Sequence, residues 1–223
     1  MHSYKTHAIV LSKRTWREND LLFSFYTENF GKVEVLATGA EKIKSKLVGH
    51  LSTFGIVEIE YVRGRLFNRL THTYLIENFG SKTDENYIFT SLIREVVNKA
   101  TQEDYPQHEI WKSLNWAITE IQNADNFEKK KLIINIFCLL ILQVLGFQLK
   151  FNQNLVCPLI NLPLDLPSFD LVQNIQNKNK SIDLSLPKKS NDQLFNFLHL
   201  YLQHNIERKF NSFNFIKQKN KLV

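Results

Sequence analysis

Basic side chains cluster at three places in the first 75 residues, and an aromatic residue lies within two of these clusters. Cationic side chains neutralise phosphate groups, and an aromatic ring offers a surface on which a nucleobase can stack. The two residue types together therefore predict a surface that binds a nucleic-acid strand. The candidate binding residues are Lys13, Arg14, Arg17, Lys42, Lys44, Lys46, His50, Arg63, Arg65 and Arg69.

The three clusters differ in their surroundings. Trp16 lies within the first cluster and Phe67 within the last, and these rings and Tyr61 are the candidate stacking surfaces. The central cluster lies in residues 31–47, where an alternating segment breaks at residues 38–40 into a lysine-rich loop. A solvated charged loop is the alternative interpretation of the central lysines. The binding interpretation requires that the three clusters converge on one face.

Positive charge is concentrated at the two ends of the chain. The 223 residues include 28 Lys and Arg against 22 Asp and Glu, a net charge of +6. Residues 1–75 and 165–223 each carry +4, whereas residues 76–164 carry −2. A local excess of positive charge favours a nucleic-acid partner. A mildly basic protein without such a partner is the alternative.

The motifs of common catalytic and metal sites are absent. The sequence has no GxxxxGK[ST], GxGxxG or HExxH motif, and its seven histidines form no recognisable ligand set. Cys138 lies in an apolar run, and Cys157 has no partner at metal-ligand spacing. We therefore predict a protein that is not an enzyme and that holds no disulfide, metal or cofactor.

The two apolar stretches of the sequence, in residues 1–11 and 132–147, are too short for a signal peptide and a membrane-spanning helix, respectively. The first 11 residues contain too short an apolar run for a signal peptide. Residues 132–147 include Asn135 and Gln143 and are shorter than the span of about 20 residues that a bilayer requires. We expect this run to form a buried helix, and we expect a cytoplasmic protein without a membrane partner.

The first 80 residues have the pattern of a small β-domain. Residues 14–20 are polar and predict a turn, and Gly31 ends a hairpin signal. Five strands in about 70 residues suit a small closed barrel such as the OB-fold. A generic antiparallel barrel or sandwich is the alternative. The predicted strands are residues 6–13, 21–27, 32–36, 53–62 and 66–76.

From residue 83 the apolar spacing becomes helical, which predicts an α+β protein. The pattern predicts helices before Pro106, over residues 110–121 and over residues 127–146, the last apolar nearly all round and capped by Gly146. Residues 151–190 hold four prolines and predict irregular structure. We therefore predict a nucleic-acid-binding domain over residues 1–79 and a helical domain over residues 80–223.

A final helix and a short tail complete the expected helical domain. Ser190 and Gln193 have the spacing of a capping box, which predicts that the last helix begins there. Residues 205–223 predict a short docking segment with a frayed end.

Several short motifs carry a family resemblance. They are AIVL at residues 8–11, Glu18, Asp20 and Leu21, YTENFGKV at residues 26–33, and TGAEKIKSKL at residues 38–47. Leu51 and Phe54 follow, and weaker matches are LLILQVLGF at residues 139–147 and Leu155 with Cys157. These motifs resemble the RecO recombination-mediator family of bacterial DNA-repair proteins. Gly39, Ala40, Lys44 and Ser45 match the family's pattern of Lys/Arg-Gly-Ala-basic-x-x-Lys-Ser.

The resemblance implies an N-terminal OB-fold and a C-terminal helical domain. It implies binding of single- and double-stranded DNA, annealing of complementary strands and loading of recombinase onto DNA coated by single-strand-binding protein. The implied partners are RecR and the acidic C-terminal tail of single-strand-binding protein. A basic rim at residues 129–131 or 208–209 is the candidate site for that tail. An OB-fold module that binds RNA or protein without annealing is the alternative.

The sequence departs from the family pattern at three kinds of position. Thr38 and Glu41 stand where the family often has basic residues, which implies weaker DNA binding through the central loop. Thr53 replaces a proline. Many members carry four zinc-binding cysteines, of which this chain matches only Cys157, so we expect no zinc.

Overall fold

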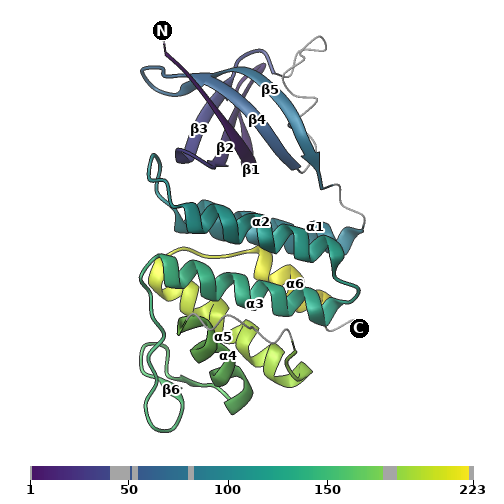
Figure 1. Ribbon diagram of the computed structural model, residues 1–223, viewed down its shortest axis with the longest axis vertical. Coiled ribbons are helices and arrows are strands. Elements are labelled where there is room, and N and C mark those ends of the chain that lie inside the picture. The colour runs from purple at the N-terminus through teal and green to yellow at the C-terminus, as the bar shows by residue number, and fades with distance from the viewer. Residues whose placement is uncertain (1, 41–50, 52–54, 80–82, 178–184, 221–223) are drawn as a thin grey trace. The chain divides into compact units, whose positions relative to one another are not determined.

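The fold is α+β, as the sequence predicts, with a five-stranded barrel followed by helices (Figure 1). The computed structural model describes residues 2–40, 51, 55–79, 83–177 and 185–220. Two compact units divide the chain. We call Met1–Lys82 with Ala100–Lys112 the barrel unit, and Thr83–Lys99 with Ser113–Val223 the helical unit.

The barrel closes in the strand order β1-β2-β3-β5-β4, which fits an OB-like fold. All neighbouring strands are antiparallel except β3 and β5, which pair in parallel. Figure 1 shows the curved strands of this barrel. The strands are β1 (Ser3–Arg17), β2 (Asp20–Thr27), β3 (Gly31–Ala37), β4 (Gly55–Val62) and β5 (Asn68–Asn78).

Alternating side chains fill the barrel from β3 and β4. In both strands every second residue is buried, as the period-two pattern predicts. The inward-facing residues of these strands include Val33, Val35, Val57 and Ile59, each at most 1% exposed. Strand β2 differs because every residue after Asp20 is buried, which removes the alternation from its sequence.

Strand β1 is longer than predicted. Residues 14–17, predicted to be part of a turn, continue the strand and pair with β2, with Arg14 opposite Leu22 and Arg17 opposite Asp20. All side chains from Ser12 to Arg17 are exposed. A strand exposed on both faces has no apolar alternation, so its sequence is indistinguishable from that of a polar turn.

The turn between β2 and β3 combines two constraints at Gly31. The Thr27 hydroxyl donates to the Gly31 carbonyl at 2.8 Å and accepts from the Phe30 N–H at 3.0 Å. Gly31 has φ +69°, and a Cβ there would lie 2.5 Å from the carbonyl oxygen of Tyr105. Glycine is therefore required both by the turn and by the close approach of residues 100–112, which belong to the same unit.

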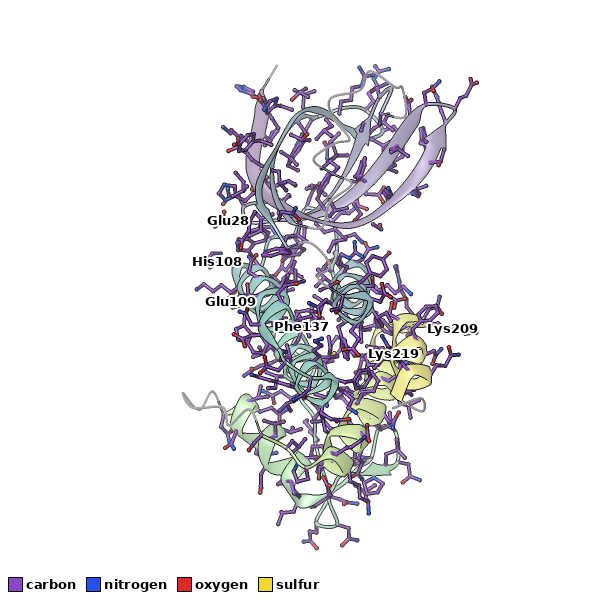
Figure 2. All side chains as sticks on the ribbon, turned by 90° about the vertical axis from the view of Figure 1, so that its right-hand side faces the viewer. Glu28, His108, Glu109, Phe137, Lys209 and Lys219 are labelled. Carbon is purple, nitrogen blue, oxygen red and sulfur yellow. The ribbon has the colours of Figure 1, made fainter. Side chains whose placement is uncertain are left out.

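The helical unit is organised around α3 (Phe127–Val144), which packs against α4 and α5. Phe137 lies at its centre, fully buried among the helices in Figure 2. Gly146 (φ +82°) donates to the carbonyl of Gln143, and Phe147 donates to that of Leu142. These bonds form a Schellman motif, so the predicted glycine cap is confirmed. The other helices are α1 (Asp84–Ala100), α2 (His108–Asn123), α4 (Leu166–Gln176), α5 (Lys188–Ile206) and α6 (Ser212–Asn220).

Residues 151–190 are more regular than predicted. They include a hairpin of β6 (Val156–Cys157) and β7 (Leu162–Pro163), and helix α4. The Asp165 side chain accepts from the Ser168 N–H at 3.1 Å and caps this helix. Pro167 stands in the first turn, where proline costs no hydrogen bond. The presence of four prolines in this segment therefore does not exclude a helix.

The predicted capping box at Ser190 is wrong, because α5 begins two residues earlier. Pro187 precedes the helix without a side-chain cap. The Ser190 hydroxyl donates to Asp165, and the Gln193 amide donates to the carbonyl of Pro163 at 3.1 Å. Both side chains bind α5 to the preceding segment. The tail, predicted to be a short docking segment, contains helix α6, whose Phe213 and Ile216 are buried.

Both cysteines of the chain, Cys138 and Cys157, are free and buried. Among the described residues no three His, Cys, Asp or Glu side chains are grouped closely enough to hold a metal ion. In the same part of the chain, every helix is too short or too polar to cross a bilayer.

We predict that Gly31→Ala destabilises the protein more than Gly146→Ala does. Both glycines have positive φ, which costs other residues about 1–2 kcal/mol. Only at Gly31 would the new Cβ also meet backbone atoms, since nothing lies within 4 Å of a Cβ at Gly146. Urea unfolding measures the two losses. Equal losses would show that the contact with Tyr105 contributes nothing.

Candidate nucleic-acid interface

Two of the three basic clusters meet at one place on the barrel. The rings of Trp16 and Phe67 contact edge to face, with centroids 4.8 Å apart and planes at 80°. Trp16 lies at the end of β1 and Phe67 in the connection between β4 and β5. OB-folds bind oligonucleotides with the face of strands 2 and 3 and with the β1–β2 and β4–β5 connections. Trp16 lies next to the first connection, and Phe67 lies in the second. The aromatic residues of the first and last clusters therefore meet in the barrel unit.

Six cationic residues lie on β1, on β5 and in the connection between β4 and β5, and all are exposed. The Arg14 guanidinium lies 5.5 Å from the Trp16 ring centroid and 3.6 Å from a carboxylate oxygen of Glu34. An exposed ion pair of this kind contributes little free energy, so it leaves Arg14 able to exchange Glu34 for a phosphate. The six residues are Lys13, Arg14, Arg17, Arg63, Arg65 and Arg69.

The central cluster, Lys42, Lys44, Lys46 and His50, lies outside the described residues. Its two flanks are described. Gly39 (φ +64°) donates its N–H to the Asp20 carboxylate at 2.7 Å, and Ala40 and Leu51 are buried in the barrel core. Asp20 is opposite Arg17 in the β1–β2 pairing, so Gly39 is bound beside a residue of the first cluster. The sequence did not reveal this bond between Asp20 and Gly39.

Tyr61 does not offer the stacking surface that its sequence position suggested. It is only 3% exposed and packs between Tyr4, stacked at 5.4 Å, and Phe30, edge-on at 6.2 Å. Burial, with the negative charge of Asp104, raises the pKa of Tyr61 to about 12. Its ring is therefore a core residue, and Trp16 and Phe67 remain as candidate stacking residues.

Residues 100–107 form a part of the site that the sequence did not indicate. The Asp104 N–H donates to the Lys32 carbonyl at 2.9 Å, and the Tyr26 hydroxyl donates to the Gln107 carbonyl at 3.0 Å. Burial raises the pKa of Tyr26 to about 12, so the hydroxyl keeps its proton. From the sequence this segment showed only a helix break at Tyr105.

These bonds place two carboxylates at the edge of a cavity of about 250 Å³, which we call the β3–β5 cavity. Strand β3, the β4–β5 connection and residues 103–104 line it. The residues that line the cavity include Glu34, Arg63, Phe67, Asn68, Glu103 and Asp104.

Two lysines of the helical unit are not available to a partner. Lys130 is bound to Glu85 at 3.1 Å, and Lys131 is bound to Glu128 at 2.9 Å and to Asp192. Both lysines are buried, so the basic rim suggested for residues 129–131 is wrong at these positions. Arg208 and Lys209 are exposed. Figure 2 shows Lys209 and Lys219 on the C-terminal segment, drawn in yellow.

Both halves of the chain match known protein families. The family described as "Recombination protein O N terminal" matches residues 1–79, and "Recombination protein O C terminal" matches residues 84–160. Similar curated proteins named DNA repair protein RecO occur in Listeria welshimeri, 27% identical over 155 residues, and Clostridium novyi, 27% over 157 residues. Each match covers 69% of this chain and 60% of the relative. The RecO of Dehalococcoides mccartyi is 35% identical over 78 residues, covering 35% of this chain and 31% of that protein.

The contact between Trp16 and Phe67 predicts a measurable energetic coupling. Aromatic pairs of this geometry contribute about 0.5–1.5 kcal/mol beyond the area that they bury. We expect the double variant Trp16→Ala/Phe67→Ala to lose less stability than the sum of the two single variants, by that amount. Urea unfolding of the four proteins gives the coupling. Strictly additive losses would contradict the contact.

Proposed function

Because the chain belongs to the RecO family of DNA-repair and recombination proteins, we propose that it binds single- and double-stranded DNA and anneals complementary strands. The observation that carries the proposal is the contact of Trp16 with Phe67, flanked by exposed cations, where OB-folds hold oligonucleotides. The chain matches 60% of the length of the RecO proteins of Listeria welshimeri and Clostridium novyi.

The arrangement supports binding that depends on phosphate contacts and ring stacking along most of a strand. Exposed arginines at the end of β1 and in the β4–β5 connection neutralise phosphates, and Trp16 offers a partly exposed ring for one base. Two complementary strands repel each other through their phosphates. A surface that holds both strands lowers this repulsion and raises their local concentration, while base pairing selects the partner strand.

The proposed role is that of a mediator and not of an enzyme, acting on DNA in the cytoplasm. The family resemblance supports RecR and the acidic tail of single-strand-binding protein as partners in recombinase loading. Arg208 and Lys209 are exposed basic residues of the helical unit and are candidates to contact that tail. The alternative is a protein that binds only RNA or only other proteins. An RNA-binding protein would bind labelled RNA but not DNA of the same length, and a protein-binding module would bind neither.

We predict that the triple variant Arg14→Ala/Arg17→Ala/Arg65→Ala weakens single-stranded DNA binding and its salt dependence. Each lost phosphate contact reduces the log–log salt slope by about 0.7, so the slope should fall by about two units. Fluorescence anisotropy with an oligothymidine at several salt concentrations measures it. Replacing Lys42, Lys44 and Lys46 with alanine tests the central cluster in the same way.

A matched control removes the same charge elsewhere. Lys112, Lys150 and Lys189 are exposed and lie outside the three clusters. Their replacement by alanine should leave the slope unchanged. If the control and the arginine variant lose equal affinity, only net charge matters and the proposed interface is wrong.

We further predict that Trp16→Ala slows strand annealing although it lowers stability by little more than the about 0.5–1.5 kcal/mol of its contact with Phe67. Stacking of a base on an aromatic ring contributes about 1–3 kcal/mol, and Trp16 is 37% exposed, so its ring is accessible. The measurement is the rate at which two labelled complementary strands form a duplex, with and without single-strand-binding protein. Tyr87→Ala, which removes an exposed aromatic residue from α1, is the control. An unchanged annealing rate for the Trp16 variant would exclude this ring from the site.

A further inference from the structure

We propose that the β3–β5 cavity takes one unstacked guanine base of the bound strand. The inference rests on the proposed DNA binding and adds a base preference to it. The cavity, of about 250 Å³, is slightly smaller than typical sites for drug-sized molecules. This volume suits a single nucleobase and not a stretch of strand.

The cavity adjoins the surface on which bases would stack. Phe67 contacts Trp16 at 4.8 Å and also lines the cavity. The β4–β5 connection is tightly folded here, since a Cβ at Gly64 would lie 2.1 Å from the Phe67 carbonyl oxygen. A base that leaves the stack on Trp16 therefore has a cavity within reach. Proteins commonly recognise single strands through bases that are splayed out and read on their open edges.

The charges in the cavity exclude phosphate. Glu103 and Asp104 are exposed carboxylates on one side, held in place by the bond from the Asp104 N–H to the Lys32 carbonyl. Ionised carboxylates only accept hydrogen bonds. Glu34, on β3, adds a third carboxylate that is shared with Arg14. The occupant must therefore donate hydrogen bonds and carry no negative charge.

The same cavity offers one strong donor group. Arg63 lines it, and its guanidinium is held 5.2 Å from the centroid of the Tyr4 ring. A guanidinium presents fixed N–H groups that pair with two neighbouring acceptors. The occupant should therefore have a pair of acceptors on one edge and donors on another.

Guanine satisfies both requirements. Its Watson–Crick edge carries two neighbouring donors, N1–H and the N2 amino group, which match a carboxylate. Its O6 and N7 acceptors match arginine. Thymine has one N–H donor between two carbonyls, and adenine and cytosine have one amino donor beside a ring acceptor. Each of these bases would leave carboxylate oxygens facing its own acceptors, at a cost in affinity.

The test measures the preference within one strand context. Fluorescence anisotropy compares a 12-residue oligothymidine with strands in which one central base is guanine, hypoxanthine, adenine or cytosine. A matched bidentate contact discriminates by about fivefold or more, so the guanine strand should bind at least that much more tightly than oligothymidine. Hypoxanthine lacks the N2 amino group and should lose most of this gain.

A carboxylate variant separates recognition from charge. Glu103→Gln/Asp104→Asn removes two negative charges, and asparagine tolerates the positive φ of +54° at Asp104. Affinity for oligothymidine should rise because phosphate repulsion falls, while the guanine preference should drop to less than twofold. Glu58→Gln/Glu77→Gln, at positions that do not line the cavity, removes the same charge and should keep the preference.

The outcomes distinguish this inference from the proposed function. Failure to bind oligothymidine at all would overturn DNA binding itself. Binding with equal affinity for guanine and hypoxanthine strands would overturn the guanine site alone, as would a preference that survives in Glu103→Gln/Asp104→Asn.

Discussion

Barrel closure depends on a short parallel pairing between β3 and β5. Only Val35 with Asn68 and Leu36 with Arg69 are in register, and the Asn68 amide adds a bond to the Glu34 carbonyl at 3.2 Å. Because β5 meets β3 at its first residues, the preceding β4–β5 connection lies beside β3. The contact of Phe67 with Trp16 and the β3–β5 cavity both follow from this geometry.

The barrel unit carries both cationic and anionic side chains on its surface, which the net positive charge of the chain does not reveal. Arg14 lies over the Trp16 ring, whereas Glu103 and Asp104 line the cavity that Phe67 also borders, brought there by residues 100–107. A surface that is basic throughout would hold a strand by its phosphates alone. Adjacent cationic and anionic areas instead favour phosphates in one place and a base edge in the other.

The sequence predicted elements well where burial is one-sided. The alternation in β3 and β4 reflects one buried face, and the continuous apolar run of α3 reflects burial on nearly all sides. Both patterns therefore predicted the correct elements. The prediction of a turn at residues 14–17 was wrong because both faces of β1 are exposed there. Helix α4 was missed because prolines were interpreted as breakers, although Pro167 occupies a first-turn position.

The sequence by itself determined the residue types of the candidate site, the α+β order of its elements and the glycines at its turns, because these depend on local conformation and periodicity. Only the tertiary structure decided which residues meet. The contact between Trp16 and Phe67 joins residues 51 positions apart, the bond from Asp104 to Lys32 brings a distant carboxylate to the barrel, and Tyr61 became a core residue. Such proximity follows from barrel closure, which no local pattern encodes.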